Sequence, residues 1–136
     1  MNNFKTCILT VGLPRSGKST WANQQKLPIV NRDSIRMALY DQPYISELEN
    51  IVSFIEDKMV ESLFIAGHNE IIIDATHLKH KYIDKWQKQY NVKLVYFSTS
   101  INECKRRAIE NKKEYLIDVI DRMVEECDLD FKFNKD

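Results

Sequence analysis

Residues 12–19, Gly12-Leu13-Pro14-Arg15-Ser16-Gly17-Lys18-Ser19, decide the fold of this chain. The stretch fits the pattern G-x-x-x-x-G-K-[ST], in which the glycines let successive backbone N–H groups point at a phosphate. An apolar, β-branched run at 6–11 precedes it, and the residues from Ser19 onward indicate the opening of a helix. A strand, a glycine loop and a helix N-terminus together favour anion binding, because the helix dipole adds to the loop N–H groups.

The loop also assigns roles to its own residues. Backbone N–H groups from Leu13 to Lys18 are expected to hold phosphates, Lys18 to neutralise the β- and γ-phosphates, and the Ser19 hydroxyl to bind Mg²⁺. The predicted cofactors are therefore ATP, or another NTP, and Mg²⁺. The predicted nucleotide-binding residues of the loop are Gly12, Leu13, Pro14, Arg15, Ser16, Gly17, Lys18, Ser19 and Thr20.

The composition is that of one ordinary globular domain. The chain has 136 residues, 43% of them hydrophobic and 29% charged, so one core is expected. Its 20 basic and 20 acidic residues cancel, which argues against a global field that attracts nucleic acid or membranes. The N-terminus lacks a secretory pattern, no apolar run is long enough for a membrane span, and the three cysteines are widely spaced. We expect a cytoplasmic protein with reduced thiols and no membrane partner; the sequence carries no signal of oligomeric state.

Strand and helix patterns alternate along the chain. Short apolar runs predict strands at 6–11, 28–31, 70–74 and 92–97. Helices are expected between and after them at 19–25, 34–40, 48–64, 80–90, 101–111 and 116–127. Strands joined by helices form right-handed crossovers and a parallel sheet covered on both faces. The predicted fold is α/β, a P-loop NTPase three-layer sandwich with about four parallel strands, in a single domain over 1–136.

Two helix starts carry the capping-box pattern S-x-x-E, at Ser46-Glu47-Leu48-Glu49 and at Ser100-Ile101-Asn102-Glu103. The first is expected to open a long amphipathic helix, and the tail at 128–136 is expected to be irregular. The apolar positions that predict the buried side of that helix are Leu48, Ile51, Val52, Ile55, Met59, Leu63 and Phe64.

Polar residues follow the second and third predicted strands. In a parallel sheet, ligands bind beyond the carboxyl ends of the strands, so 31–33 and 74–77 are expected to face the same edge as the P-loop. Asp33 would lie one strand end away from the γ-phosphate and could take a proton from an attacking hydroxyl. The alternative is that Asp33 only caps the helix predicted at 34–40.

Three segments, 8–22, 31–36 and 72–78, resemble in their order the kinase domain of bacteriophage-type polynucleotide kinases. The N-R-D-x-x-R element at 31–36 is the most specific of them, whereas many NTPases share the P-loop. In that family the aspartate of this element activates a nucleic-acid 5′-hydroxyl, and the arginine three residues later binds substrate phosphate. The resemblance thus implies Asp33 as the general base and Arg36 as a substrate ligand; the alternative for Arg36 is a solvated helix arginine.

The segment after the third strand resembles the Asp-containing turn of the same family. It implies Asp74, Thr76 and His77 as substrate-binding residues, with Asp74 orienting the substrate, Arg36 or Mg²⁺. A turn-and-cap role for this segment is the alternative, and no clear additional Walker B pattern is present. His77 and His80 have no third ligand at a suitable spacing, so a metal site there is not expected.

The family also folds a basic lid over the nucleotide, and an arginine in it stabilises charge on the phosphates. The corresponding lid region, roughly 101–115, contains two adjacent arginines. The resemblance implies Arg106 as the catalytic arginine and Arg107 as a nucleotide-binding one. Glu110 occupies the position expected for a second lid arginine, so either Arg106 or Arg107 acts alone or the lid has diverged.

These expectations combine into a kinase that transfers the γ-phosphate of ATP to a hydroxyl, with Asp33, Lys18 and Arg106 as catalytic residues. A polynucleotide 5′-hydroxyl is the preferred acceptor, and the few candidate basic residues are compatible with a grip on one or two terminal nucleotides. A small-molecule, nucleoside or nucleotide kinase is the first alternative, and a non-catalytic nucleotide-binding module is the second. No phosphatase segment follows within the 136 residues, so 3′-end dephosphorylation is not expected.

Overall fold

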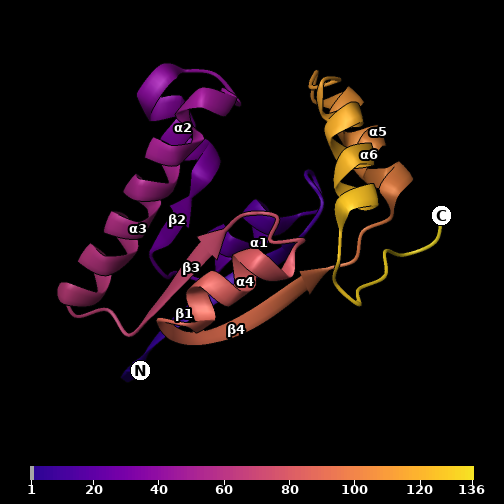
Figure 1. The fold of residues 1–136 in the computed structure, drawn as a ribbon. Helices are drawn as coiled ribbons and strands as arrows, with labels where there is room; N and C mark the ends of the chain where they lie inside the picture. Colours follow the sequence, from indigo (N-terminus) through magenta and orange to yellow (C-terminus); the bar gives the residue numbers. More distant parts are fainter. Residues whose placement is uncertain (1) are drawn as a thin grey trace.

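Four parallel strands form one sheet in the order β2-β3-β1-β4 (Figure 1). The computed structural model describes residues 2–136, with side chains from Lys5 onward. The strands are β1 (Asn2–Gly12), β2 (Ile29–Asn31), β3 (Glu70–Asp74) and β4 (Tyr90–Phe97). The P-loop strand β1 is central because it pairs with β3 on one side and β4 on the other. The predicted α/β fold with a four-stranded parallel sheet is confirmed.

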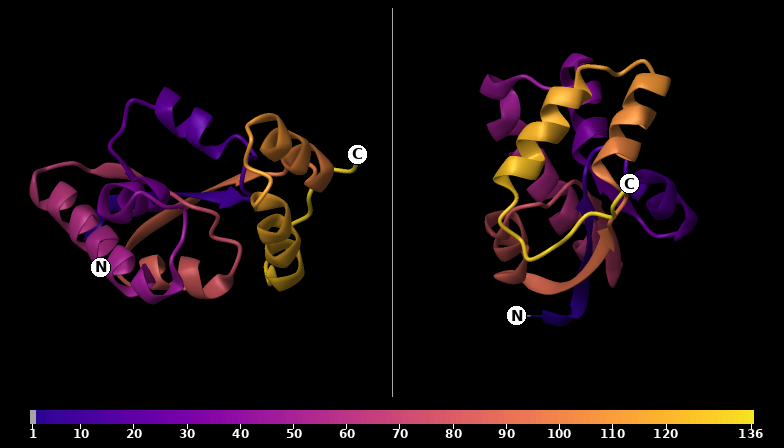
Figure 2. Two further views of the ribbon diagram at one scale, coloured as in Figure 1. Left: turned by 90° about the horizontal axis from the view of Figure 1, so that it is seen from above. Right: turned by 90° about the vertical axis from the view of Figure 1, so that its right-hand side faces the viewer.

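Helices cover both faces of the sheet. They are α1 (Lys18–Gln24), α2 (Arg32–Tyr40), α3 (Glu49–Ile65), α4 (His80–Gln87), α5 (Ile101–Glu110) and α6 (Leu116–Glu126), with a short 3-10 turn η1 (Ser46–Leu48) before α3. Helix α1 lies against one face, and α3 and α4 lie against the other (Figure 2). Helices α5 and α6 form a hairpin beyond the carboxyl end of β4. No helix within residues 2–136 is long and apolar enough to cross a membrane.

The main core lies between the sheet and the layer of α3 and α4. Its fully buried members include Cys7, Leu9, Val30, Val52, Val60, Ile71 and Ile73. The continuous apolar run of β3 is buried on both faces, as expected for a strand inside a parallel sheet. A second cluster, of Val11, Leu13, Leu78, Cys104 and Ile120, joins the P-loop to the α5–α6 hairpin.

The buried side of α3 differs from the prediction. Its buried residues are Val52, Glu56, Val60 and Phe64, four residues apart, whereas Ile51 is 48% exposed. The apolar pattern was ambiguous because this helix carries apolar residues on more than one side. Glu56 can lie on this buried side of the helix, although it is a carboxylate, because it pairs with Arg32 of α2.

One of the two predicted capping boxes is wrong. Ser46 begins the turn η1, and no side chain caps either η1 or α3. The Glu49 carboxylate is instead bound by two arginines of α2. At α5 the Ser100 hydroxyl does cap the helix, accepting from the Glu103 N–H at 3.1 Å.

The C-terminal tail is irregular, as predicted, but it packs against the end of β4. Phe131 stacks on Tyr96 with ring centroids 5.4 Å apart. The Asn134 N–H donates to the Ser98 carbonyl at 2.6 Å. The tail therefore holds the strand end from which the α5–α6 hairpin departs.

Candidate active site

The P-loop connects β1 to α1 and depends on two glycines for different reasons. Gly12 is the register partner of Phe97 in β4, and a Cβ there would lie 2.9 Å from the Phe97 Cβ and 2.8 Å from the Ser16 Oγ. Gly17 has a φ of 101°, in the left-handed region. Gly12 is thus required for close approach of two strands, and Gly17 for the backbone conformation that starts α1.

Lys18 is buried inside the loop. Its Nζ donates to the Leu13 carbonyl at 2.5 Å and lies 3.5 Å from the Ser16 Oγ. Burial lowers the pKa of Lys18 to about 8, and the carboxylates of Asp74 and Asp33 oppose that shift. The ammonium group therefore already lies in the cradle that the sequence assigns to phosphates.

An open cavity of about 610 Å³ lies over the P-loop. Residues of the loop form its floor, and Trp21, Gln24, Phe97 and Thr99 complete its walls. Trp21 meets Phe97 edge to face, with centroids 5.8 Å apart. Sequence reasoning did not single out Trp21, Gln24 or Phe97. Their signal was position alone, since Trp21 and Gln24 follow the loop and Phe97 ends β4.

The two lid arginines have different surroundings. Arg107 lines the cavity, and its Nη1 donates to the Arg15 carbonyl at 3.2 Å. Arg106 is 60% exposed and pairs with Glu103 and Glu110 along α5. The structure therefore brings Arg107 to the P-loop and leaves Arg106, predicted as catalytic, outside the cavity lining. A hydrogen bond from Arg15 to Asn111 fastens the same hairpin to the loop.

The Ser19 hydroxyl donates to the Asp74 Oδ2 at 2.7 Å. The same oxygen accepts from the Asn31 Nδ2 at 2.9 Å, and the other, Oδ1, lies 3.2 Å from the Thr10 hydroxyl. A hydroxyl beside a carboxylate is the oxygen donor set that P-loop proteins offer Mg²⁺. Asp74 thus lies on the metal side of the site and makes no contact with Arg36. Its sequence signal was the buried run of β3, which ends in an aspartate beside the P-loop strand.

The turn after β3 is hydrogen-bonded to the end of β1 and to the first residue of the P-loop. The Thr76 carbonyl accepts from the Gly12 N–H at 3.1 Å. The His77 ring is buried, with its Nδ1 2.7 Å from the Thr10 carbonyl, and burial lowers the pKa of His77 to about 4. Because a neutral ring donates to that carbonyl, His77 braces β1. This placement does not support the substrate-binding role expected for His77.

Asp33 lies in the first turn of α2 with its carboxylate 79% exposed. Helix α2 begins at Arg32, two residues earlier than predicted, and the side chain of Asn31 caps it by accepting from the Ser34 N–H at 2.8 Å. The alternative that Asp33 caps this helix is therefore wrong. Its negative charge partly opposes the lowering of the Lys18 pKa by burial, and it adds to the effect of burial in raising the pKa of Tyr115 in the hairpin.

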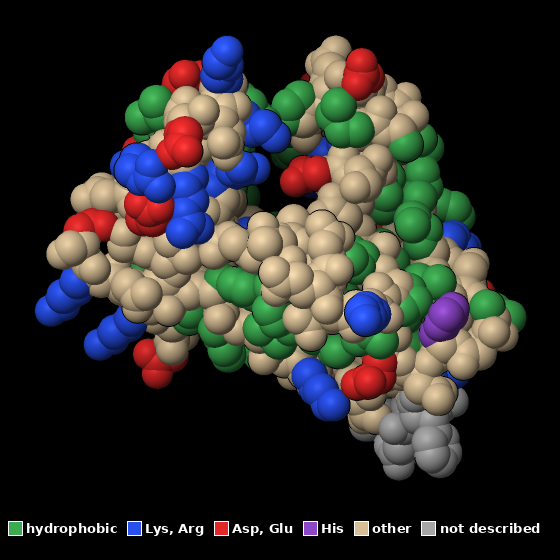
Figure 3. Space-filling model, turned by 180° about the vertical axis from the view of Figure 1, so that it is seen from behind, with side chains coloured by type: hydrophobic (Ala, Val, Ile, Leu, Met, Phe, Trp, Pro, Cys, Tyr) green, Lys and Arg blue, Asp and Glu red, His purple; other side chains and the backbone are tan. Residues whose placement is uncertain are grey.

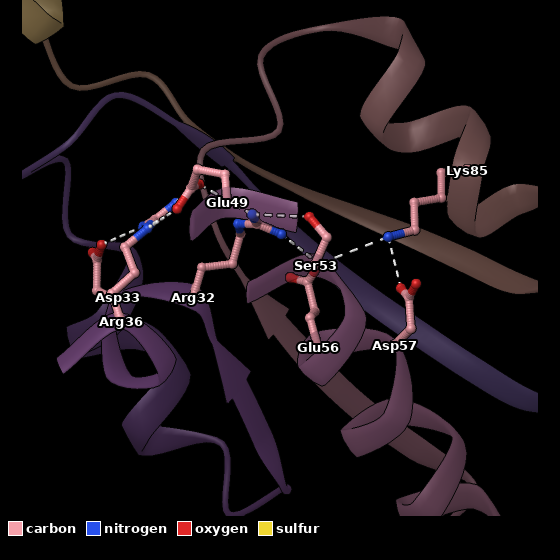
Figure 4. A network of polar contacts seen from close by, with 8 residues as sticks. All are labelled: Arg32, Asp33, Arg36, Glu49, Ser53, Glu56, Asp57 and Lys85. Carbon is pink, nitrogen blue, oxygen red and sulfur yellow. Dashed lines mark hydrogen bonds and ion pairs between the residues drawn. The ribbon is translucent and has the colours of Figure 1, made fainter. Parts of the chain in front are cut away.

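Arg36 is held by carboxylates on both sides (Figure 4). Its Nη1 donates to Asp33 at 2.7 Å, and its Nε and Nη2 donate to the two oxygens of Glu49 at 2.9 and 2.6 Å. The side chain is only 14% exposed, and the Tyr44 ring lies 5.7 Å from the guanidinium. Arg36 is thus an ordered ion-pair residue, and the solvated-arginine alternative is wrong.

The ion pairs continue from Glu49 into the α3–α4 layer. Arg32 contacts Glu49 at 3.2 Å and Glu56 at 2.9 Å, and Lys85 of α4 lies 2.6 Å from Asp57. Although burial raises the pKa of Glu49, its hydrogen bonds from Arg36 and Arg32 lower that pKa below the ordinary value. Sequence reasoning assigned Glu49 only to a capping box and missed Glu56, since the arginine that contacts both lies on another helix. These ion pairs thereby hold α2 in place, both at the P-loop edge and against α3.

A hollow separates the α5–α6 hairpin from α2 and α3, and Lys and Arg side chains gather on its hairpin side (Figure 3). The sheet order, the P-loop and this hollow define a P-loop kinase-like domain, a class that generally binds an NTP with Mg²⁺. The chain belongs to the AAA_33 family, described as an AAA domain, whose family model matches residues 7–128.

Solved structures share the fold at low sequence identity. A protein in the structure of the Pnkp1/Rnl/Hen1 RNA repair complex is 20% identical, with a TM-score of 0.66 over 97% of this chain and 48% of that one. A gluconokinase from Sinorhizobium meliloti 1021 is 16% identical, with a TM-score of 0.61 over 97% and 82%. A shikimate kinase from Acinetobacter baumannii, in complex with shikimate, is 15% identical, with a TM-score of 0.53 over 97% and 84%. The chain spans about half the length of the RNA repair protein.

Proposed function

We propose that this chain is an ATP- and Mg²⁺-dependent kinase that transfers the γ-phosphoryl group to the 5′-hydroxyl of a polynucleotide. The observation that carries the proposal is the Asp33 carboxylate. It is exposed, held by Arg36 at 2.7 Å, and its charge partly opposes the lowering of the Lys18 pKa by burial. A general base for a hydroxyl needs this combination of access and proximity to the phosphate cradle. The N-R-D-x-x-R element and the likeness to the RNA repair protein support the polynucleotide acceptor.

In this proposal, catalysis comes from positioning and electrostatics. Loop N–H groups hold the phosphates, Lys18 turns from the Leu13 carbonyl to the transferred group, and Ser19 with Asp74 holds Mg²⁺, which supplies further positive charge when bound. Asp33 takes the proton of the attacking hydroxyl as its oxygen bonds to phosphorus and the bond to the ADP oxygen breaks. Arg107 offsets charge on the donor phosphates.

The donor groups of Arg36 suit a single phosphate of the acceptor. A guanidinium has five N–H donors. One each on Nε, Nη2 and Nη1 is used by Glu49 and Asp33, so two remain, and a phosphate accepts such a pair side by side. The nearby carboxylates of Asp33, Glu49 and Glu56 balance the arginines, which fits a grip on the end of a strand more than a long electrostatic footprint.

The test is Asp33→Asn with ATP and a 5′-hydroxyl oligonucleotide. Loss of the general base is expected to lower the transfer rate by roughly 10²- to 10⁴-fold, while ATP binding measured by calorimetry stays unchanged. The matched control is Asp41→Asn at the other end of α2, since Asp41 is exposed and its left-handed backbone tolerates asparagine. Near-normal transfer by Asp33→Asn would reject the general-base assignment.

A kinase of a small hydroxyl compound is the second candidate. It is favoured by the likeness to the gluconokinase and the shikimate kinase, which this chain covers over 82% and 84% of their length. A panel of 5′-hydroxyl DNA and RNA oligonucleotides, nucleosides and polyhydroxy acids distinguishes the two candidates. ATP consumption that requires one of these acceptors would also exclude a non-catalytic nucleotide-binding module.

A further inference from the structure

Asn31 is the one side chain of the described residues that contacts both the start of α2 and the Ser19–Asp74 pair. It is the last residue of β2 and the register partner of Asp74 in β3. Because α2 begins at the next residue, no loop separates Asn31 from α2, the helix that carries the proposed general base. A movement of the Asn31 side chain is therefore transmitted directly to the first turn of α2.

The two ends of the Asn31 amide have different partners. The Oδ1 accepts from the Ser34 N–H at 2.8 Å, and the Nδ2 donates to the Asp74 Oδ2 at 2.9 Å. A backbone N–H can only donate and a carboxylate can only accept, so these partners fix which end of the amide is oxygen. An aspartate at this position would lack the donor, and a serine would be too short to reach both partners.

The Asp74 oxygen that Asn31 contacts also accepts from the Ser19 hydroxyl at 2.7 Å. Ser19 belongs to α1 on the donor side, and Ser34 belongs to α2 on the acceptor side, next to Asp33. A continuous chain of hydrogen bonds thus runs from the P-loop serine through Asp74 and Asn31 to the helix that carries the proposed base.

We infer that Asn31 is a positioning residue that aligns Asp33 with the Ser19–Asp74 pair, so that loading of the P-loop sets the place of the general base. This inference rests on the proposed function only where it concerns transfer. The alignment itself is a property of the hydrogen bonds, and it can be measured in the absence of any acceptor. Asn31 does not touch the reacting atoms; it acts through Asp74 on one side and α2 on the other.

Asn31→Ser separates the two contacts of the amide. Serine is a good helix N-cap, so the bond to the Ser34 N–H is retained while the donor to Asp74 is lost. Asn31→Ala removes both contacts, and the difference between the two variants measures the cap alone. Thermal unfolding of the three proteins is expected to place Asn31→Ser below the wild type, because the bond to Asp74 is lost, and Asn31→Ala below both.

The decisive readout is the backbone amide signal of Ser34 in NMR spectra when Mg²⁺ and ADP are added. In the wild type this signal is expected to shift, because the loaded P-loop acts on Asp74 and Asn31. In Asn31→Ser, ADP is expected to bind with unchanged affinity, the Ser34 shift to disappear, and transfer to a 5′-hydroxyl oligonucleotide to fall about tenfold or more, as for a lost hydrogen bond to a charged group.

The inference is overturned if the Ser34 shift is absent in the wild type or survives in Asn31→Ser. It is also overturned if Asn31→Ser loses ADP affinity and is as unstable as Asn31→Ala, since that would mean a general folding role. A wild type with the Ser34 shift but no transfer to any 5′-hydroxyl end would reject the proposed function and leave the alignment by Asn31 standing.

Discussion

The donor half and the acceptor half of the candidate site are built in different ways. The donor half is one continuous segment, Gly12 to Ser19, whose floor is backbone and whose buried lysine comes from the same loop. The acceptor half is made of side chains from two helices, with Arg36 of α2 clamped between Asp33 and Glu49. Backbone N–H groups can donate to phosphate whatever the side chains of the loop are, whereas a single substitution removes an ion pair. Under the proposed function, phosphate binding is thus a property of the loop shape, and acceptor choice depends on a few exchangeable side chains.

The largest effect is expected where the α5–α6 hairpin meets the donor half. Arg107→Ala should lower transfer by about 10³-fold if this arginine offsets transition-state charge, because Arg107 lines the cavity over the P-loop. Arg106→Ala is the matched control on the same helix and should change the rate little, since Arg106 is exposed and pairs along α5. Single-turnover rates measure both. A larger loss in Arg106→Ala would restore the role that the family resemblance implies for that residue.

An intermediate effect is expected from Glu49→Gln in the acceptor half. The amide cannot match the two charge-assisted bonds to Arg36, so kcat/KM for the acceptor should fall roughly 10- to 100-fold, the range for hydrogen bonds to charged groups. ATP affinity should not change, because Glu49 contacts α2 and not the P-loop. The exposed neighbour Glu47 supplies the control, Glu47→Gln. Loss of ATP binding in Glu49→Gln would show that Glu49 also supports the P-loop.

The smallest effect concerns pH and the donor half alone. The pKa of Lys18 is lowered to about 8, and bound phosphates favour the charged ammonium. ATP affinity should therefore be flat below that pKa and weaken as pH rises through it, approaching about tenfold per pH unit. Calorimetric titrations over this range test it. Lys18→Met should bind weakly with no such pH dependence; an unchanged slope in that variant would assign the titration to another group.

The same contrast explains what the sequence could predict. The P-loop and the four strands are written in contiguous residues, so periodicity and one motif were sufficient for them. Glu49 and Glu56 could not be found in this way, because their roles arise when α3 packs against α2. Glu49 fits a capping pattern, but its carboxylate binds Arg32 and Arg36 instead. These arginines belong to another helix, so the sequence around Glu49 does not reveal them.

Residues near a motif were also misjudged where a neighbour satisfied the same need. Asn31 caps α2, which frees the Asp33 carboxylate for Arg36 and moves the helix start to Arg32. Arg106 and Arg107 are adjacent, and only the direction of each side chain on α5 distinguishes them. His77 has a substrate-like position in the sequence, but the turn after β3 directs its ring to the Thr10 carbonyl.

The central place of β1 has a consequence for the order of folding. Strand β1 is synthesised before both of the strands that it pairs with, β3, from Glu70, and β4, from Tyr90. Parallel pairing across such separations closes long loops before any strand contact is gained, and it is intrinsically slow. The P-loop can take its final shape only after Phe97 lies beside Gly12. A nascent chain therefore acquires its phosphate cradle late, only after Phe97 of β4 has been added.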